Sequence, residues 1–159
     1  MPEPQSPIVA GAAEFGSCRL RDVSHLAKWR IWEGDSEVAL GTAHHQGGSL
    51  VVAVAPGEWM VIGDKPNVDE VIDMTHVRAA VRLTGVGARS LLECVCALDL
   101  SESMTPNGAA ARTLVAGVAT ELIRDDVAGE PSYLLLLSRS FARSVWDRLE
   151  EAASQPQAR

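Results

Sequence analysis

The residues best suited to acid–base or metal chemistry are few and widely separated. Two adjacent histidines, His44 and His45, have no Cys, Asp or Glu near them at the spacing of a metal site. On a strand they would point to opposite faces, so we expect them in an exposed loop. His76 lies between Asp73 and Arg78, which predicts a polar cluster at a strand end without a nucleophile to activate. The signatures of a nucleophile elbow, a Walker loop and a zinc protease do not occur.

The segment Gly85–Ser90 (GVGARS) comes closest to a nucleotide-binding motif. It follows a strand-like run and precedes a helical one, where fingerprint glycines would let backbone amides approach a pyrophosphate. Ser90 stands where the motif needs a final glycine or alanine, and too few residues follow for the rest of a Rossmann domain. We therefore favour a tight strand-to-helix turn and keep nucleotide binding as a weaker hypothesis.

Four residues have types that suit a protein interface. Arg78 and Arg112 each adjoin a strand-like run, and arginine is enriched at interfaces. The structural alternative for Arg112 is an ion pair across the turn that contains Asp99. The chain has four Trp but only two Phe and one Tyr, so the tryptophans are expected as large anchors of the core or of an interface. Trp59, His76, Arg78 and Arg112 are the candidate interface residues, and no catalytic, cofactor-binding or metal-binding set is predicted.

The three cysteines are predicted to be free. Cys18, Cys94 and Cys96 cannot all pair, and the two-residue spacing of the last two places them on different faces of a helix. Buried free thiols in a reducing compartment are the simplest interpretation. We expect a cytoplasmic protein, because the N-terminus lacks the basic segment and apolar run of a secretory signal.

Composition limits the classes of partner and the number of domains. With 159 residues, 47% of them hydrophobic, the chain suits one compact domain. The net charge of −7 argues against nucleic acid or an anionic membrane as the main partner. No apolar run approaches the roughly 18 residues of a membrane span. A protein or a small molecule is therefore the expected partner.

Short β-like runs dominate the first half of the chain. The expected strands are Ala27–Trp32, Val38–Thr42, Leu50–Val54, Glu58–Ile62 and Val77–Leu83. A further run, Val68–Met74, fits either a strand or a short helix. The runs end at turn signals such as Pro56-Gly57, which favours antiparallel connections over long crossovers.

The second half changes period and predicts the order β, α, β, β, β, α. A helix capped by Thr84 should end near Leu98, and Thr113–Ile123 should form two strands bent near Gly117. Ser132–Leu137 is a buried strand by its continuous apolar run, and Arg139–Ala153 is an amphipathic helix. These elements define an α+β fold. We expect a flexible tail over residues 1–16, a single domain over 17–153, with two lobes separated near 64–70 as an alternative, and a second tail over 154–159.

Several segments combine small, aliphatic and arginine residues in a recognisable order. They are Leu20–Lys28, Pro56–Gly63 (PGEWMVIG), Asp73–Gly85 (DMTHVRAAVRLTG), Ala88–Leu92, Cys96–Leu100, Ala111–Val118 (ARTLVAGV) and Ser138–Asp147 (SRSFARSVWD). In order and spacing they resemble the gamma subunit of heterotetrameric sarcosine oxidase, from about Cys18 to Ala153. The wider group that shares this architecture is the glycine-cleavage T protein and its folate-binding relatives.

The resemblance implies a fold, a function and a set of partners. The fold would be a mainly antiparallel sheet with helices on one side, like the N-terminal part of the T protein. The partners would be alpha, beta and delta subunits that carry FAD, FMN, NAD, tetrahydrofolate and zinc, while this chain supplies no catalytic residue. The complex would be a flavoenzyme of one-carbon metabolism that oxidatively demethylates sarcosine or a related secondary amine, passes the one-carbon unit to tetrahydrofolate and makes hydrogen peroxide.

One alternative from a different class stays open. A stand-alone folate-binding one-carbon transfer protein would share the T-protein fold. T proteins, however, carry a longer chain with a C-terminal barrel and a Lys-Gly-containing loop, and neither occurs in this sequence. We therefore expect an assembly role, not a complete folate site.

Overall fold

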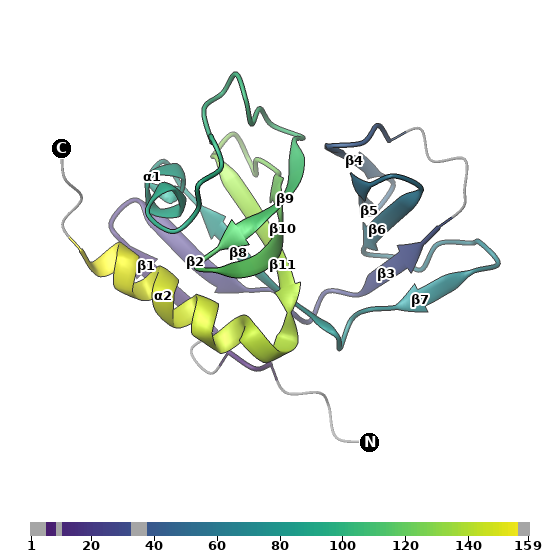
Figure 1. Ribbon diagram of the computed structural model, residues 1–159, viewed down its shortest axis with the longest axis horizontal. Helices are drawn as coiled ribbons and strands as arrows, with labels where there is room; N and C mark the ends of the chain where they lie inside the picture. Colours follow the sequence, from purple (N-terminus) through teal and green to yellow (C-terminus); the bar gives the residue numbers. More distant parts are fainter. Residues whose placement is uncertain (1–5, 9–10, 33–37, 156–159) are drawn as a thin grey trace.

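A computed structural model describes residues 6–8, 11–32 and 38–155. The described chain forms two antiparallel sheets that face each other, with the helices beside the larger one (Figure 1). The predicted α+β class, with mainly antiparallel strands and helices on one side, is confirmed. No helix within the described ranges is long and apolar enough to cross a membrane.

Six strands form the large sheet in the order β1-β2-β8-β11-β10-β9. They are β1 (Ala12–Phe15), β2 (Cys18–Asp22), β8 (Arg78–Thr84), β9 (Ala110–Val115), β10 (Val118–Arg124) and β11 (Ser132–Ser138). Strand β11 is buried on both faces, as its apolar run predicts: Leu135 and Leu137 pack with the helices, and Leu134 and Leu136 pack toward the small sheet. The β9–β10 pair turns at Gly117, where the bend was expected.

Helices α1 (Ala88–Glu93) and α2 (Ala142–Ser154), with the short 3-10 helix η1 (Arg139–Phe141), cover the outer face of the large sheet (Figure 1). Helix α2 buries Val145, Trp146 and Leu149 of the predicted stripe, but Phe141, expected with them, lies in η1 and is exposed because the α-helix begins only at Ala142. Helix α1 is shorter than expected. Thr84 does not cap it, because this residue ends β8 and its hydroxyl bonds that of Ser132 at 2.9 Å.

The glycines before α1 serve packing. A Cβ at Gly85, whose φ is +121°, would lie 2.1 Å from the Ser17 carbonyl oxygen, and one at Gly87 would lie 2.4 Å from the Ser17 hydroxyl. The β8–α1 turn and the β1–β2 turn can therefore approach only because these positions lack side chains. Close packing explains the pattern that suggested a dinucleotide site and supports the preferred reading of a tight turn.

Five strands form the small sheet in the order β4-β5-β6-β3-β7. They are β3 (Lys28–Ile31), β4 (Thr42–Gln46), β5 (Ser49–Ala55), β6 (Glu58–Ile62) and β7 (Val71–Asp73). The strand expected at Val38–Thr42 is displaced, since β4 begins at Thr42. The expectation of a loop for His44 and His45 was wrong, because β5 supplies the pairing partners that place them in β4.

The boundaries differ from the expected ones. The chain leaves the large sheet after Asp22 and returns to it at Arg78, so residues 23–27 and 74–77 are the two crossings between the sheets. The break expected near 64–70 falls inside the small sheet, between β6 and β7. Residues 12–15, expected in a tail, form β1, because β2 pairs with them along four residues.

Candidate functional site

An apolar layer joins the inner faces of the two sheets. The small sheet contributes Ala43, Leu50, Val52, Met60 and Ile62, and the large sheet contributes Ala80, Ala110, Ile123, Leu134 and Leu136. Strand alternation places polar side chains of the same faces at both ends of this layer. Each end carries a cluster of charged groups that links one sheet to the other.

The first cluster contains three arginines around two glutamates, and we call it the Arg–Glu cluster. From the small sheet, Arg30 Nε lies 3.0 Å from Glu58 Oε1. From the large sheet, Arg112 Nη2 lies 3.3 Å from Glu58 Oε1 and 3.2 Å from Glu121 Oε1, and Arg78 Nη2 lies 3.0 Å from Glu121 Oε1. The Glu121 side chain is only 3% exposed, so its carboxylate is compensated by these arginines and not by water.

The cluster brings together two predicted interface residues, Arg78 and Arg112. Both use their guanidinium groups within the chain, and Arg112 pairs with Glu58 and Glu121 instead of forming the ion pair considered with Asp99. Arg112 remains 48% exposed, whereas Arg78 is 18% exposed. Arg112 is thus the member that a partner could still reach.

The second cluster joins the sheets at the opposite end of the layer. Asp125 lies just after β10, and its two carboxylate oxygens lie 2.7 Å from His45 Nε2 and 2.9 Å from Arg82 Nη2. Arg82 also donates to the Ser132 hydroxyl at 3.0 Å. Asp125 is nearly buried and His45 is largely exposed, so the imidazole is oriented by a carboxylate at the protein surface.

The third site is a cavity of about 410 Å³ at the crossings between the sheets. It is lined by Ser6, Asp22, Ser24, His25, Thr75, His76 and Arg139. His76, the third predicted interface residue, is exposed here. Hydrogen bonds from Thr75 lower the pKa of the neighbouring Asp73 carboxyl below its ordinary value, with His76 as a smaller cause.

A lysine is buried close to this cavity. Lys28 is fully buried, and its ammonium donates to the carbonyl oxygens of Ser24 at 2.8 Å and Leu26 at 2.7 Å. Burial lowers the pKa of Lys28 to about 8, although the charges of Asp22 and Asp73 oppose the shift. The group therefore changes charge at a pH where an exposed lysine would stay protonated.

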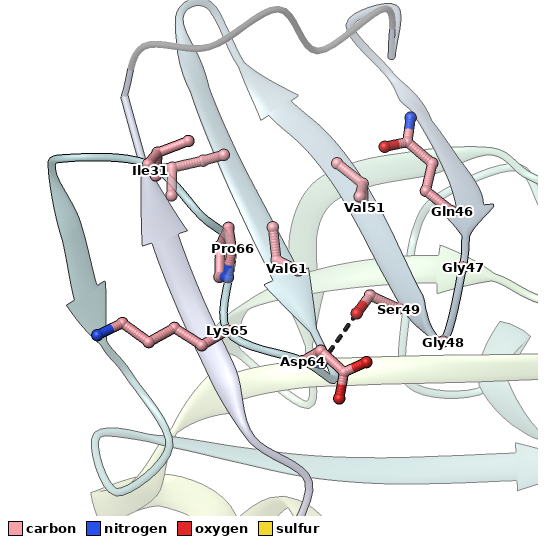
Figure 2. A pocket seen from close by; sticks show the side chains of 11 residues that line it. Ile31, Gln46, Gly47, Gly48, Ser49, Val51, Val61, Asp64, Lys65 and Pro66 are labelled. Carbon is pink, nitrogen blue, oxygen red and sulfur yellow. Dashed lines mark hydrogen bonds between the residues drawn. The ribbon is translucent and has the colours of Figure 1, made fainter.

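The last site lies on the outer face of the small sheet, and we call it the outer pocket. It has a volume of about 390 Å³ and is lined by Ile31, Gln46, Gly47, Gly48, Ser49, Val51, Val61, Asp64, Lys65, Pro66 and Val68. Figure 2 shows Ile31, Val51 and Val61 projecting from neighbouring strands, with Ser49 and Asp64 at one end. Trp59, the fourth predicted interface residue, is half-buried in the same outer layer.

The predicted interface residues therefore do not form one surface. Trp59 belongs to the outer layer, His76 to the crossings, and Arg78 and Arg112 to the Arg–Glu cluster. Within the described ranges, no three His, Cys, Asp or Glu side chains gather as a metal site would require. Of the cysteines expected to be buried, Cys94 is exposed, because α1 ends just before it.

Comparison with solved structures identifies proteins that share this fold. One match is a chain of heterotetrameric sarcosine oxidase from Corynebacterium sp. U-96 in complex with pyrrole 2-carboxylate, with a TM-score of 0.75 and 19% identity over 98% of this chain and 99% of that one. Another is the glycine cleavage system aminomethyltransferase T from Bartonella henselae, with a TM-score of 0.63 and 13% identity. That match covers 84% of this chain and 45% of the aminomethyltransferase.

The chain has the fold shared by these two proteins. Both neighbours fall in the groups that the sequence resembles, so the resemblance is confirmed at the level of fold. No family model matches the chain, and no curated protein matches it in sequence. At these sequence identities the similarity establishes the fold of this chain. Its function has to be argued from the residues of the candidate site.

Three residues that matter here were not predicted from the sequence: Lys28, Glu121 and Asp125. A signal for Lys28 was present, because Lys28 and Arg30 alternate with Trp29 and Ile31 along one strand, which places two cations on one face. Glu121 also had a signal, because strands that turn near Gly117 place it opposite Arg112, whereas Asp125 gave none, since its partners Arg82 and His45 lie far away in the sequence.

Proposed function

We propose that this chain is a non-catalytic, gamma-type subunit of a complex like heterotetrameric sarcosine oxidase, and that it works by assembly and stabilisation. The observation that carries the proposal is the end-to-end correspondence with one chain of that enzyme, 98% of this chain against 99% of the other. The aminomethyltransferase, by contrast, is matched over 45% of its length. A subunit of such a complex is expected to match one chain of the heterotetramer over its whole length.

The geometry is consistent with an assembly role. The Arg–Glu cluster and the His45–Asp125–Arg82 cluster tie the two sheets together at both ends of their apolar layer. Such links hold the sheets in one relative orientation, so surfaces that belong to different sheets keep fixed positions. A rigid chain of this kind can hold larger subunits in register.

In this proposal the chemistry resides in partner chains. Alpha, beta and delta subunits would carry FAD, FMN, NAD, tetrahydrofolate and zinc. The complex would oxidatively demethylate sarcosine or a related secondary amine, pass the one-carbon unit to tetrahydrofolate and produce hydrogen peroxide. The contribution of this chain is then measured by whether the complex forms and keeps its flavin.

The test is co-expression of the tagged chain with the subunits encoded beside it. We expect a yellow preparation in which flavin absorbance, a flavoprotein subunit and this chain elute together in size-exclusion chromatography. A colourless, monodisperse single chain would contradict the subunit role. Saturable binding of tetrahydrofolate by that single chain would instead support a stand-alone folate-binding one-carbon transfer protein.

A further inference from the structure

The two crossings between the sheets carry the same pattern of residue types. Residues 22–25 read Asp-Val-Ser-His, and residues 73–76 read Asp-Met-Thr-His. Each segment takes the chain from a strand of one sheet to a strand of the other, from β2 to β3 in the first case and from β7 to β8 in the second. The two segments therefore occupy equivalent places in the fold, and their residues can be compared position by position.

Matching hydrogen bonds account for the first three positions of the pattern. The aspartate Oδ1 accepts the amide of the hydroxyl residue at 2.9 Å in both crossings, from Ser24 N in the first and from Thr75 N in the second. Each hydroxyl oxygen in turn accepts a strand amide at 3.0 Å, from Ala80 to Ser24 and from Lys28 to Thr75. The apolar residue between them packs into the layer that joins the sheets. These three residue types are what the turn itself requires.

The turn does not account for the fourth position, which is histidine in both crossings. His25 and His76 are exposed, and neither ring forms a hydrogen bond or an ion pair with another residue of the described ranges. Both residues line the cavity of about 410 Å³ at the crossings, which we call the crossing cavity. Two histidines that the turns do not need are thus brought to one cavity from distant parts of the sequence, which identifies the cavity as a candidate binding site.

The lining of the crossing cavity contains more cationic than anionic side chains. The imidazoles of His25 and His76 and the guanidinium of Arg139 stand against one carboxylate, that of Asp22. Both oxygens of this carboxylate already accept hydrogen bonds, one from a backbone amide and one from the Ser6 hydroxyl. A guanidinium and two imidazoles are donors suited to the oxygens of an anion.

The charges around the crossing cavity favour a ligand with a single negative charge. Burial lowers the pKa of Lys28, which lies close to the cavity, and the charge of Arg139 lowers it further. The charges of Asp22 and Asp73 oppose this shift, so two carboxylates and two fixed cations act on the same region. A surplus of positive charge comes only from the histidines, since imidazoles gain protons between about pH 5 and pH 8. A carboxylate suits such a region better than an anion with two charges.

We propose that the crossing cavity binds a small-molecule carboxylate, to which His25 and His76 donate from the two crossings and Arg139 donates from η1. The cavity volume lies within the range of about 300–1,000 Å³ that small-molecule pockets occupy. The site is built by this chain alone, so it goes beyond the assembly role and does not depend on it.

The first experiment titrates the full-length chain with sodium acetate and follows the histidine ring signals by NMR. The titration is run at about pH 6, with NaCl keeping the ionic strength constant. His44 and His45 lie on β4 outside the cavity lining, so the chain carries its own control. We expect the signals of His25 and His76 to follow one saturation curve and those of the two β4 histidines to stay in place. Similar shifts of all four histidines, or no shift, overturn the binding site.

Sodium sulfate tests the charge of the ligand in the same assay. An oxyanion with two charges should bind more weakly than acetate, because the Asp22 carboxylate belongs to the lining. Tighter binding of sulfate than of acetate overturns the assignment to a carboxylate.

The second experiment removes one imidazole at a time. His25→Gln and His76→Gln should each weaken acetate binding about tenfold, through the loss of one hydrogen bond to a charged group. The matched control His44→Gln should leave the acetate affinity unchanged, and all three variants should keep the melting temperature of the unaltered chain. Unchanged acetate affinity in both cavity variants overturns the proposal, and a lowered melting temperature in its place would assign the histidines to the structure of the turns.

Discussion

The two sheets differ in how much of their surface this chain covers by itself. The large sheet is covered on one face by α1 and α2 and on the other by the small sheet, so Leu134 to Leu137 are all fully buried. The inner face of the small sheet packs on the large sheet, while its outer face buries a smaller apolar cluster around Ile31, Val51 and Val61 beside the outer pocket. The comparison teaches that the large sheet is closed by complete elements on both faces, whereas the outer face of the small sheet buries only a small cluster beside a pocket.

The buried carboxylate of the Arg–Glu cluster gives the largest expected effect. Glu121→Ala removes a buried carboxylate and leaves Arg78 and Arg112 without it, so we expect a loss of about 3–5 kcal/mol in the free energy of unfolding. Glu58→Ala is the control, because Glu58 is 24% exposed and its loss should cost markedly less. Urea denaturation of both variants measures the difference. Equal losses would show that burial of the Glu121 carboxylate does not make it more important for stability than the half-buried carboxylate of Glu58.

The next prediction compares one side chain from each region. Leu135→Ala empties a closed core and should cost about 2–5 kcal/mol. Val51→Ala should cost about 1.5 kcal/mol, the transfer of two methyl groups with little cavity term, because Val51 borders an open pocket. Urea denaturation of the isolated chain is the measurement. A Val51→Ala cost as large as that of Leu135→Ala would mean that the outer face is as closed as the core.

The division between regions also explains what the sequence predicted well. The apolar run of Ser132–Leu137 and the period of Arg139–Ala153 describe local patterns that burial on the large sheet reinforces. The strand forms as predicted, and the α-helix forms from Ala142 onward. Thr42–Gln46 is a polar strand that exists because β5 pairs with it, and Ala12–Phe15 depends on β2 in the same way. Their residues carry no periodic signal of their own.

The site was less predictable than the fold for a related reason. Arg78 and Glu121 are 43 residues apart, as are Arg82 and Asp125, so only the fold brings them together. Residue type singled out Arg78 and Arg112 as anchors but could not tell an interface with another chain from a contact within this one. Continuous apolar runs in β5 and β6 place apolar side chains on both faces of the small sheet, a pattern from which no pocket was predicted.

The smallest expected effect concerns Lys28, which lies on the inner face of the small sheet. Its pKa is about 8 in the folded chain and about 10.5 when exposed, so between these values the unfolded state binds more protons. The free energy of unfolding should therefore rise with pH through this window, by about 1.3 kcal/mol from pH 7 to pH 9. Lys28→Met, which keeps the apolar stem without the charge, should abolish the rise.

Cys18 must be replaced before the effect of Lys28 on the pH dependence of stability can be measured, because its thiol titrates in an overlapping pH range. Burial raises the pKa of its thiol to about 11 from 9.0, so the unfolded state loses this proton first and stability falls as pH rises through that window. The two slopes oppose each other near pH 9, and the Cys18→Ala background isolates the lysine. Urea denaturation at several pH values in this background decides the matter. A flat profile with Lys28 present would show that its ammonium is solvated, and the small sheet would then be open to water on its inner face as well as its outer one.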